Sequence, residues 1–590
     1  MCTPGVPALA LAFVAVAGPG RRREAAGATT RAARYPRNVP DATPTERPDL
    51  AAWWREGVLY QIYPRSFADS NGDGIGDLPG ITAHLDHLNG RDDSLGVDGI
   101  WISPFYRSPM ADFGYDVADY CDVDPAFGTL EDFDELVREA HARGIRVIVD
   151  LVPNHTSDQH AWFQESRSSR SNPKRDWYVW ADPKPDGSPP NNWRSVFWKR
   201  QRAAWTLDPA TGQYYHHSFL PEQPDLNWWN PEVREPFDGI LRFWLDRGVD
   251  GFRIDVAHRM ARDPDLRDNP EYGLADGEYL RDWDETTAPR DQDWPEVHEI
   301  LRGFRRTLDE YDARMAIGEV FLLDPARLVR YYGEHEDELH LAFNFSFQRA
   351  PWSARAFRDE VETFERLLPS GAWPDYTLNN HDNPRSVSRY APAGDLVRGR
   401  QRARLAALML LTLRGTPFLY YGEELGMADG PIPPGRVVDV AGRDPERTPM
   451  QWDPSPGAGF TTGDPWLPIN PEARLINAAA QRADPTSLLA LHRELIAIRR
   501  GSAALRRGSY RSLDGAPDDV FAYVREAGSE RWLVALNFSD QMESWRLPGL
   551  RGRLRLSTDP ADPAPGRPMY DQVAIPAEAG LLISLEPASA

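Results

Sequence analysis

Residues 132–155 read DFDELVREAHARGIRVIVDLVPNH, and this stretch holds the pattern that decides the fold. Its first half, residues 132–143, carries apolar side chains three and four residues apart, which predicts a helix with one buried face. Gly144 predicts the end of that helix. The apolar run at residues 145–152 predicts a buried strand, and polar residues follow it directly. The stretch therefore indicates a helix–strand unit with polar side chains at the end of the strand.

The same order of helix, strand and polar cluster returns later in the chain. Further helices are expected at residues 236–247, 304–314 and 402–413, each followed by a short apolar strand. Alternating helices and strands predict a parallel sheet. The chain has 590 residues, which is enough for one (β/α)₈ TIM barrel with additions, so we predict an α/β fold of that kind. Such barrels carry their chemistry directly after the strands, where these polar clusters lie.

Three stretches depart from this alternation. Residues 156–227 are irregular and rich in tryptophan, and residues 426–471 are rich in glycine and proline. Both compositions predict long loops, one inserted after the third strand and one over the barrel mouth. Short alternating apolar runs near the end predict an antiparallel β domain. The predicted organisation is a tail at 1–50, the barrel at 51–155 and 228–502 (with the loop 426–471), an inserted domain at 156–227 and a β domain at 503–590.

The first fifty residues differ in composition from the rest. An apolar run at residues 6–18 precedes an arginine triplet at residues 21–23 and is too short to span a bilayer. No basic residue precedes the run, which is atypical of a secretion signal. An atypical leader, a disordered tail and a start codon assigned too early all stay open, and we expect a cytoplasmic protein. The two cysteines, Cys2 and Cys121, do not indicate a structural disulfide.

The charge balance narrows the class of partner. The chain carries 67 basic and 89 acidic residues, a formal net charge of -22. This balance argues against nucleic acid or an anionic membrane as the main partner and favours a neutral small molecule. Aromatic residues make up 11 % of the chain, which suits the flat faces of sugars, although most of the 20 tryptophans are expected in the core.

Three acids follow predicted strands. They are Asp255 in GFRIDVAH, Glu319 in IGEV and Asp382 in NNHDNPR. Arg253 precedes Asp255 by two residues, so on a strand both side chains point the same way and the arginine favours the ionised carboxylate. Acids at several strand ends of one barrel converge on one cleft. Glycoside hydrolysis needs two such carboxylates beside the scissile bond.

Several segments together resemble glycoside hydrolase family 13, the α-amylase family. Within that family they are most similar to the α-glucosidases of the oligo-1,6-glucosidase subfamily. The match runs from the start of the barrel to the last β domain, and its motifs stand in the family's order. These segments are VLYQIYPRSFADSNGDGIGDLPGI (58–81), GIWISPFYRSPMADFGYDVADY (99–120), DLVPNH (150–155), QPDLN (223–227), GFRIDVAH (251–258), IGEV (317–320) and NNHDNPR (379–385).

The resemblance implies a role for each acid. Asp255 is similar to the nucleophile that forms a covalent glucosyl-enzyme, and Glu319 to the general acid that later acts as the base. Asp382 resembles the third acid, which binds sugar hydroxyls. Arg253 resembles the arginine that orients the nucleophile. Chemically, Asp255 must be ionised and Glu319 protonated for the first step.

The resemblance also implies substrate-binding residues. His155 and His381 resemble the histidines that bind hydroxyls of the terminal glucose, and Tyr115 is placed in the same glucose site. Asp116, in GYDVADY, resembles an acid that binds the non-reducing-end glucose and pairs with an arginine beyond the fourth motif. Arg400 is favoured for that partner. A pocket closed by such a pair explains exo action, because the sugar chain cannot run past it.

The loop length beyond the fourth motif leaves the register open, so three other arginines stay open as partners of Asp116. They are Arg398, Arg402 and Arg404.

A run of alternating oxygen-bearing residues precedes the second strand. Its spacing suits a hard cation, although a polar turn explains the spacing equally well. Relatives bind calcium in the similar loop, so the resemblance implies a structural Ca²⁺. No catalytic metal or other cofactor is expected. The implied ligands are Asp69, Asn71, Asp73, Asp77 and the backbone carbonyl of Ile75.

The implied function is that of a retaining, exo-acting α-glucosidase on maltose- or isomaltose-type oligosaccharides. A trehalose synthase or transglucosidase of the same family is the first alternative, and a non-catalytic barrel relative is the second. Val256 after Asp255 resembles enzymes that accept α-1,6 bonds, where many α-1,4-specific relatives carry threonine. One side chain shifts such selectivity by about 1–3 kcal/mol, so both linkages stay open with maltose slightly ahead. The oligomeric state is not indicated.

Overall fold

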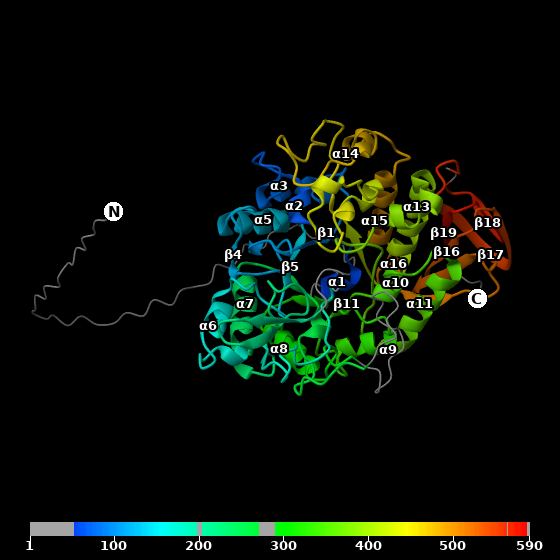
Figure 1. Cartoon of the computed structure of the whole chain (residues 1–590). Coiled ribbons are helices and arrows are strands. Elements are labelled where there is room, and N and C mark those ends of the chain that lie inside the picture. The colour runs from blue at the N-terminus through cyan, green and yellow to red at the C-terminus, as the bar shows by residue number, and fades with distance from the viewer. Residues whose placement is uncertain (1–51, 198–202, 271–288, 563–564, 587–590) are drawn as a thin grey trace, which may run out of the picture. The chain divides into compact units, whose positions relative to one another are not determined.

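Eight parallel strands form one nearly closed sheet in the computed structural model, which describes residues 52–197, 203–270, 289–562 and 565–586. Their order in the sheet is β11-β10-β9-β5-β2-β1-β13-β12. Helices surround the strands (Figure 1), so the predicted (β/α)₈ barrel is confirmed. The predicted tail at 1–50, with Cys2, lies outside the described residues. The strands are β1 (Leu59–Ile62), β2 (Gly99–Ile102), β5 (Arg146–Leu151), β9 (Gly251–Ile254), β10 (Met315–Gly318), β11 (Leu341–Ala342), β12 (Asp375–Thr377) and β13 (Thr416–Tyr420).

The register of the central strands brings the acids to one edge of the sheet. Arg253 on β9 pairs with Asp150 on β5 and with Ile317 on β10. The amide of Asp255 donates to a carbonyl of β5 over 2.8 Å, and the amide of Glu319 donates to a carbonyl of β9 over 2.8 Å. Both acids therefore leave the barrel at the same level, at the carboxyl ends of adjacent strands.

Amphipathic helices cover the strands. Helix α5 begins with a capping box, in which Thr129 and Asp132 each accept a hydrogen bond from the other's backbone amide. Its buried residues lie three and four positions apart, as in the other covering helices. The longer helices are α5 (Leu130–Ala142), α7 (Arg234–Asp246), α8 (Val297–Leu308), α11 (Ala354–Leu367), α13 (Leu396–Thr412) and α15 (Leu488–Gly501).

The helix predicted at 304–314 is misplaced. Helix α8 spans Val297–Leu308, and the apolar face formed by Val297, Ile300, Phe304 and Leu308 defines it. After that face is complete, the chain turns, and the amide of Tyr311 donates to the Leu308 carbonyl over 3.0 Å. The polar residues before β10 thus form a turn rather than the last helical turns.

The inserted segment 156–227 contains helix α6 (Ala161–Ser168) and a small antiparallel sheet in the order β6-β8-β7. A buried ion pair between Arg262, which follows β9, and Asp225 fixes this segment to the barrel. Arg262 also donates to Asn154 Oδ1 over 3.0 Å. The strands are β6 (Trp180–Ala181), β7 (Trp205–Asp208) and β8 (Gln213–His216).

An antiparallel sheet in the order β14-β15-β16-β19-β17-β18 closes the described chain, as predicted. It packs on the barrel through α13 (Figure 1). At this contact the hydroxyl groups of Thr412 and Tyr523 lie 2.6 Å apart. Within the described ranges, no helix is both long and apolar enough to cross a membrane. The strands are β14 (Ser509–Ser512), β15 (Val520–Ala527), β16 (Glu530–Asn537), β17 (Glu543–Ser557), β18 (Pro568–Ile575) and β19 (Gly580–Leu585).

Candidate active site

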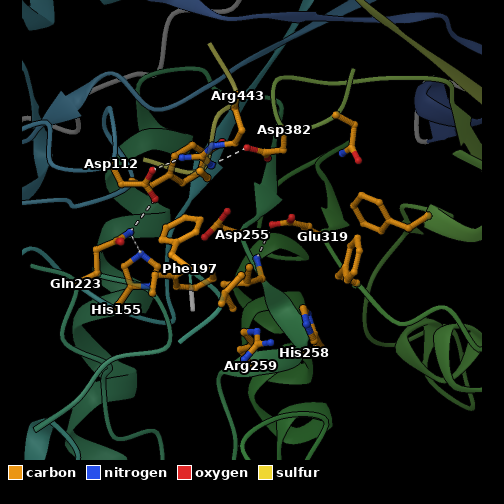
Figure 2. A pocket seen from close by; sticks show the side chains of 18 residues that line it. Asp112, His155, Phe197, Gln223, Asp255, His258, Arg259, Glu319, Asp382 and Arg443 are labelled. Carbon is orange, nitrogen blue, oxygen red and sulfur yellow. Dashed lines mark hydrogen bonds and ion pairs between the residues drawn. The ribbon is translucent and has the colours of Figure 1, made fainter. Parts of the chain in front are cut away.

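A cavity of about 350 Å³ lies at the carboxyl ends of the barrel strands and contains the three predicted acids. Residues of the inserted segment and of the loop 426–471 complete its walls. Figure 2 shows the side chains pointing into this cavity from several elements. Those labelled there are Asp112, His155, Phe197, Gln223, Asp255, His258, Arg259, Glu319, Asp382 and Arg443.

Arg253 contacts two of the three acids, Asp255 and Glu319, through its guanidinium group. Its guanidinium is buried, with Nη1 2.5 Å from Asp255 Oδ1 and 2.6 Å from Asp150 Oδ1. Its Nη2 lies 2.8 Å from Glu319 Oε2. Burial raises the pKa of Asp255 well above its usual value, the positive charge of Arg253 opposes this, and the neighbouring Glu319 adds to it. Burial therefore disfavours two negative charges on Asp255 and Glu319 together, and the positive charge of Arg253 favours one of them.

The carboxyl groups of Asp255 and Glu319 both line the cavity, and both contact the guanidinium group of Arg253. A strained residue between the two strands helps to place Glu319. Val256 has a left-handed backbone with φ of 36°, which is costly for a β-branched residue. This conformation directs the Val256 amide at Glu319 Oε2 over 3.0 Å. Arg253 and the Val256 amide thus hold both carboxyl groups in the same cavity.

Asp382 is held by two arginines of the loop 426–471. Its Oδ1 lies 2.8 Å from Arg443 Nη1 and 2.8 Å from Arg447 Nη2. Burial alone would raise the pKa of Asp382, but His381 and the two arginines together hold it well below the usual range. Asp382 therefore presents a carboxylate, a hydrogen-bond acceptor, to the cavity.

The two predicted histidines occupy different positions. His155 lines the cavity, and its Nε2 lies 3.1 Å from the amide nitrogen of Gln223. His381 is fully buried and is not part of the cavity lining; it lies behind Asp382 and Tyr115, the second of which does line the cavity. Burial lowers the pKa of both histidines, so both rings are neutral.

The predicted pairing of Asp116 with an arginine of α13 is wrong. Asp116 is fully buried outside the cavity lining, and its oxygens accept hydrogen bonds from Ser108 Oγ and from the amides of residues 111 and 112. Burial raises the pKa of Asp116 to about 6. Arg400 instead pairs with Glu472 over 2.7 Å. Asp116 therefore shapes the loop around the cavity and does not reach into it.

The other three candidate arginines also point away from the cavity. Arg398 and Arg402 both pair with Glu578 of the C-terminal domain. Arg404 donates to the carbonyl oxygens of residues 486 and 558. Helix α13 turns these side chains outward, because its apolar face packs on the barrel.

The acid and arginine that do meet in the cavity are Asp112 and Arg443. Asp112 Oδ1 lies 2.6 Å from Arg443 Nη2, and Asp112 Oδ2 accepts a hydrogen bond from Gln223 over 3.1 Å. Figure 2 shows Arg443 between Asp112 and Asp382 along one wall. Asp112 lies in the family-like segment 99–120 and Arg443 in the predicted loop 426–471, but no sequence pattern distinguishes either residue. Asp112 stands four residues before Asp116 in the same segment, and only the geometry distinguishes the two acids.

The predicted calcium loop is held by its own backbone amides. Asp69 Oδ1 accepts from the amides of Asn71 and Gly72 over 3.0 and 2.7 Å, and Asp73 Oδ1 accepts from the amide of Ile75 over 2.8 Å. Asp77 Oδ2 accepts from the amide of residue 70, and Asp77 Oδ1 accepts from the amide of residue 80 and so caps helix α3 (Leu78–Ala83). In the part of the chain that the structure describes, no three acidic, histidine or cysteine side chains converge on a metal position. The donor set is all oxygen, which matches calcium chemically.

Several known proteins are similar to this chain over most of its length. The probable alpha-glucosidase of Rhizobium meliloti is 45 % identical over 515 residues, covering 84 % of this chain and 91 % of that protein. The oligo-1,6-glucosidase of Parageobacillus thermoglucosidasius is 40 % identical, covering 84 % and 92 %. The crystal structure of the alpha-glucosyl transfer enzyme XgtA superposes with a TM-score of 0.82 at 40 % identity, covering 90 % of this chain and 99 % of that one. Residues 61–508 match the family model described as the alpha amylase catalytic domain, and the chain belongs to that family.

Proposed function

We propose that this protein is a retaining, exo-acting α-glucosidase that releases glucose from the non-reducing ends of short α-glucosides. The observation that carries the proposal is the meeting of Asp255 and Glu319 in one cavity whose wall is bridged by Asp112 and Arg443. The relatives named alpha-glucosidase and oligo-1,6-glucosidase support the same assignment.

In the proposed mechanism, each acid carries one step. Asp255 attacks the anomeric carbon while Glu319 gives its proton to the leaving oxygen, so a glucosyl ester forms as the glycosidic bond breaks. Glu319 then takes a proton from water, which attacks the same carbon and frees Asp255. Arg253 holds the nucleophile in place, and the Asp382 carboxylate accepts hydrogen bonds from sugar hydroxyls.

The bridge between Asp112 and Arg443 accounts for exo action. It joins the loop after β2 to the loop 426–471 and occupies one wall of the cavity. A cavity of about 350 Å³ holds roughly one or two sugar rings, which suits a terminal glucose and its leaving group better than an internal stretch of polymer.

Glucosyl transfer is a second candidate reaction. The likeness to the XgtA structure favours it, as do Phe321 and Phe345, whose rings lie 5.0 Å apart and line the cavity near Glu319. Flat apolar rings bind sugar faces and make the acceptor side less favourable for water. Products with more than one sugar unit at high maltose concentration would identify transfer.

Glucose release tests the main proposal. Maltose, isomaltose, sucrose, trehalose and soluble starch are compared, with Asp255→Asn as the inactive control. Rapid release from small disaccharides with slow attack on starch is expected, with maltose slightly ahead of isomaltose. Interconversion of maltose and trehalose without free glucose would assign an isomerase, and no reaction on any sugar would assign a binding protein.

We also propose that loop 69–77 binds a structural calcium ion through its side-chain oxygens and the Ile75 carbonyl. The loop is docked on the loop 426–471, because the amide of Asp69 donates to Phe460 O over 2.9 Å and the amide of Trp466 donates to Gly74 O over 3.0 Å. A bound ion would stiffen this contact beside the cavity. We expect a calcium chelator to lower the Tm of the wild type and added Ca²⁺ to restore it. In Asp73→Ala, the chelator should leave the Tm unchanged.

We propose a cytoplasmic location, in keeping with a chain that has only two cysteines. Cell fractionation with an antibody against the protein tests this location.

A further inference from the structure

A glutamine of the first barrel strand is hydrogen-bonded to the histidine behind the third acid. The Gln61 side chain on β1 is buried, and its Nε2 lies 2.8 Å from His381 Nδ1 and 3.2 Å from Ser103 Oγ. The other ring nitrogen, His381 Nε2, lies 2.7 Å from Tyr115 Oη and 3.2 Å from Asp382 Oδ2. The ring therefore links Gln61, which the proposed mechanism does not use, to two groups that line the cavity.

The neighbours of His381 decide where its single proton lies. The ring is neutral, because burial lowers its pKa well below the usual value. Asp382 is ionised, and a carboxylate only accepts hydrogen bonds. A proton on Nε2 faces this carboxylate favourably, whereas a lone pair at Nε2 would face its negative charge. Nδ1 is then an acceptor, so Gln61 must present an N–H group to it.

The surroundings of the ring preserve this arrangement. Tyr115 and Tyr63 stack on the ring with interplanar angles of 3° and 20°, which fixes its plane. Trp101 contacts it edge-on. The charged groups around it, besides Asp382, are the guanidinium groups of Arg253, Arg443 and Arg447, and all three disfavour a second proton.

We propose that Gln61 is a positioning residue that fixes the proton of His381 on Nε2 and so directs a hydrogen bond at Asp382 and Tyr115. Without a donor at Nδ1, the proton is free to move there, and the lone pair of Nε2 then faces the Asp382 carboxylate. Asp382 turns away from that lone pair. A displacement of about 1 Å at a reacting centre costs about 100-fold in rate. The inference rests on the proposed function, in which Asp382 binds the glucose.

Two substitutions with side chains close in size to glutamine test whether the Gln61 amide donates to His381 Nδ1. Gln61→Met removes it, and kcat/KM for maltose is expected to fall about 100-fold at every pH. Gln61→Glu supplies a carboxyl group instead of an amide. At low pH an extra proton shared between that carboxyl and the ring keeps Nε2 protonated, so activity is retained. As pH rises this proton is lost, and kcat/KM falls in a step that the wild type lacks. A purely structural role would not produce this step.

Ser103→Ala is the matched control, because it removes the other hydrogen bond of the same amide and leaves the contact with His381. Its loss of kcat/KM is expected to be several-fold smaller than that of Gln61→Met. If Gln61→Glu matches the wild type at all pH values, the amide oxygen accepts a proton from Nδ1 and the inference is overturned.

A readout without activity separates this inference from the proposed function. In protein labelled with [15N]histidine, the ring signals of His381, assigned by their loss in His381→Asn, are expected to show a protonated Nε2 and a bare Nδ1. The opposite tautomer overturns the inference even if the enzyme is active. If the wild type releases no glucose from any α-glucoside, the proposed function fails, while the tautomer still decides the role of Gln61.

Discussion

Asp112 and Arg443 lie 331 residues apart in the chain and are joined by an ion pair of 2.6 Å in the wall of the cavity. Arg443 also contacts Asp382 and Asp439, each over 2.8 Å. One guanidinium therefore balances three carboxylates and ties the loop after β2 to the loop 426–471. The position of Asp382 depends on this tie. Its side chain is 26 % exposed, and its Oδ1 is held by ion pairs with Arg443 and Arg447.

Replacement of Arg443 tests this dependence. Arg443→Met leaves Asp112 and Asp382 without their shared partner, and breaking a buried pair in this way costs about 3–5 kcal/mol. We expect kcat/KM for maltose to fall at least about 100-fold, which corresponds to about 2.7 kcal/mol, mainly through a higher KM. Steady-state kinetics on maltose measure this. Arg436→Met, in the same loop but outside the cavity lining, is the control and should behave as the wild type. An unchanged KM in Arg443→Met would contradict the role of the bridge.

The role of Glu319 is tested by the leaving group. Glu319→Gln cannot give a proton to the glycosidic oxygen, and general acid catalysis contributes about 10²–10⁴-fold. We expect a loss of that size on maltose but a much smaller loss in the first turnover of an aryl α-glucoside, whose leaving group needs no proton. Rapid-mixing kinetics measure that turnover. Asp255→Asn should lose both reactions, because no glucosyl ester can form. Equal losses on both substrates in Glu319→Gln would show that this residue is not the acid.

The barrel and the places of Asp255 and Glu319 in it were predictable because each of these two acids follows a short apolar run. That pattern is local, so the sequence placed Asp255 and Glu319 on adjacent strand ends. The partner of Asp112 was not predictable, because the loop 426–471 has no periodicity that would place Arg443. Asp112 and Asp116 share one segment, and only the folded loop shows that the amides of the first turn capture Asp116.

Gln61 shows a different limit of the sequence. A glutamine in a strand of four residues gives no signal of its contact, because the contact runs across the barrel to a residue 320 positions away. The shift of α8 has a simpler cause. The apolar spacing continued weakly past Leu308, and the polar turn that ends the helix resembles an exposed helical face.

Glu423, after β13, makes the stability depend on pH. Burial raises its pKa from 4.5 to about 7, and the amide of Tyr420 donates to its Oε2 over 3.1 Å. The folded state favours the protonated form, so the carboxyl group costs nothing below pH 4.5 and opposes folding increasingly as pH rises to about 7. We expect Glu423→Gln to raise the free energy of unfolding by up to about 3 kcal/mol at pH 8. Thermal unfolding at pH 4 and pH 8 measures this. A gain of equal size at both values would contradict the titration of Glu423.

Val256 offers a test of linkage preference. Its side chain lines the cavity beside Glu319, where the leaving group departs, and its backbone amide holds Glu319 Oε2. Val256→Thr keeps a β-branched side chain, so the left-handed backbone and this amide contact should persist. The new hydroxyl adds a hydrogen-bonding group on the leaving-group side, and one such group changes selectivity by about 1–3 kcal/mol. We expect the ratio of kcat/KM for maltose to that for isomaltose to rise about tenfold. Val196→Thr, which places the same hydroxyl on the wall formed by the inserted segment, is the control and should leave the ratio unchanged. A ratio that moves equally in both variants would show that polarity of the cavity, rather than the position of residue 256, sets the preference.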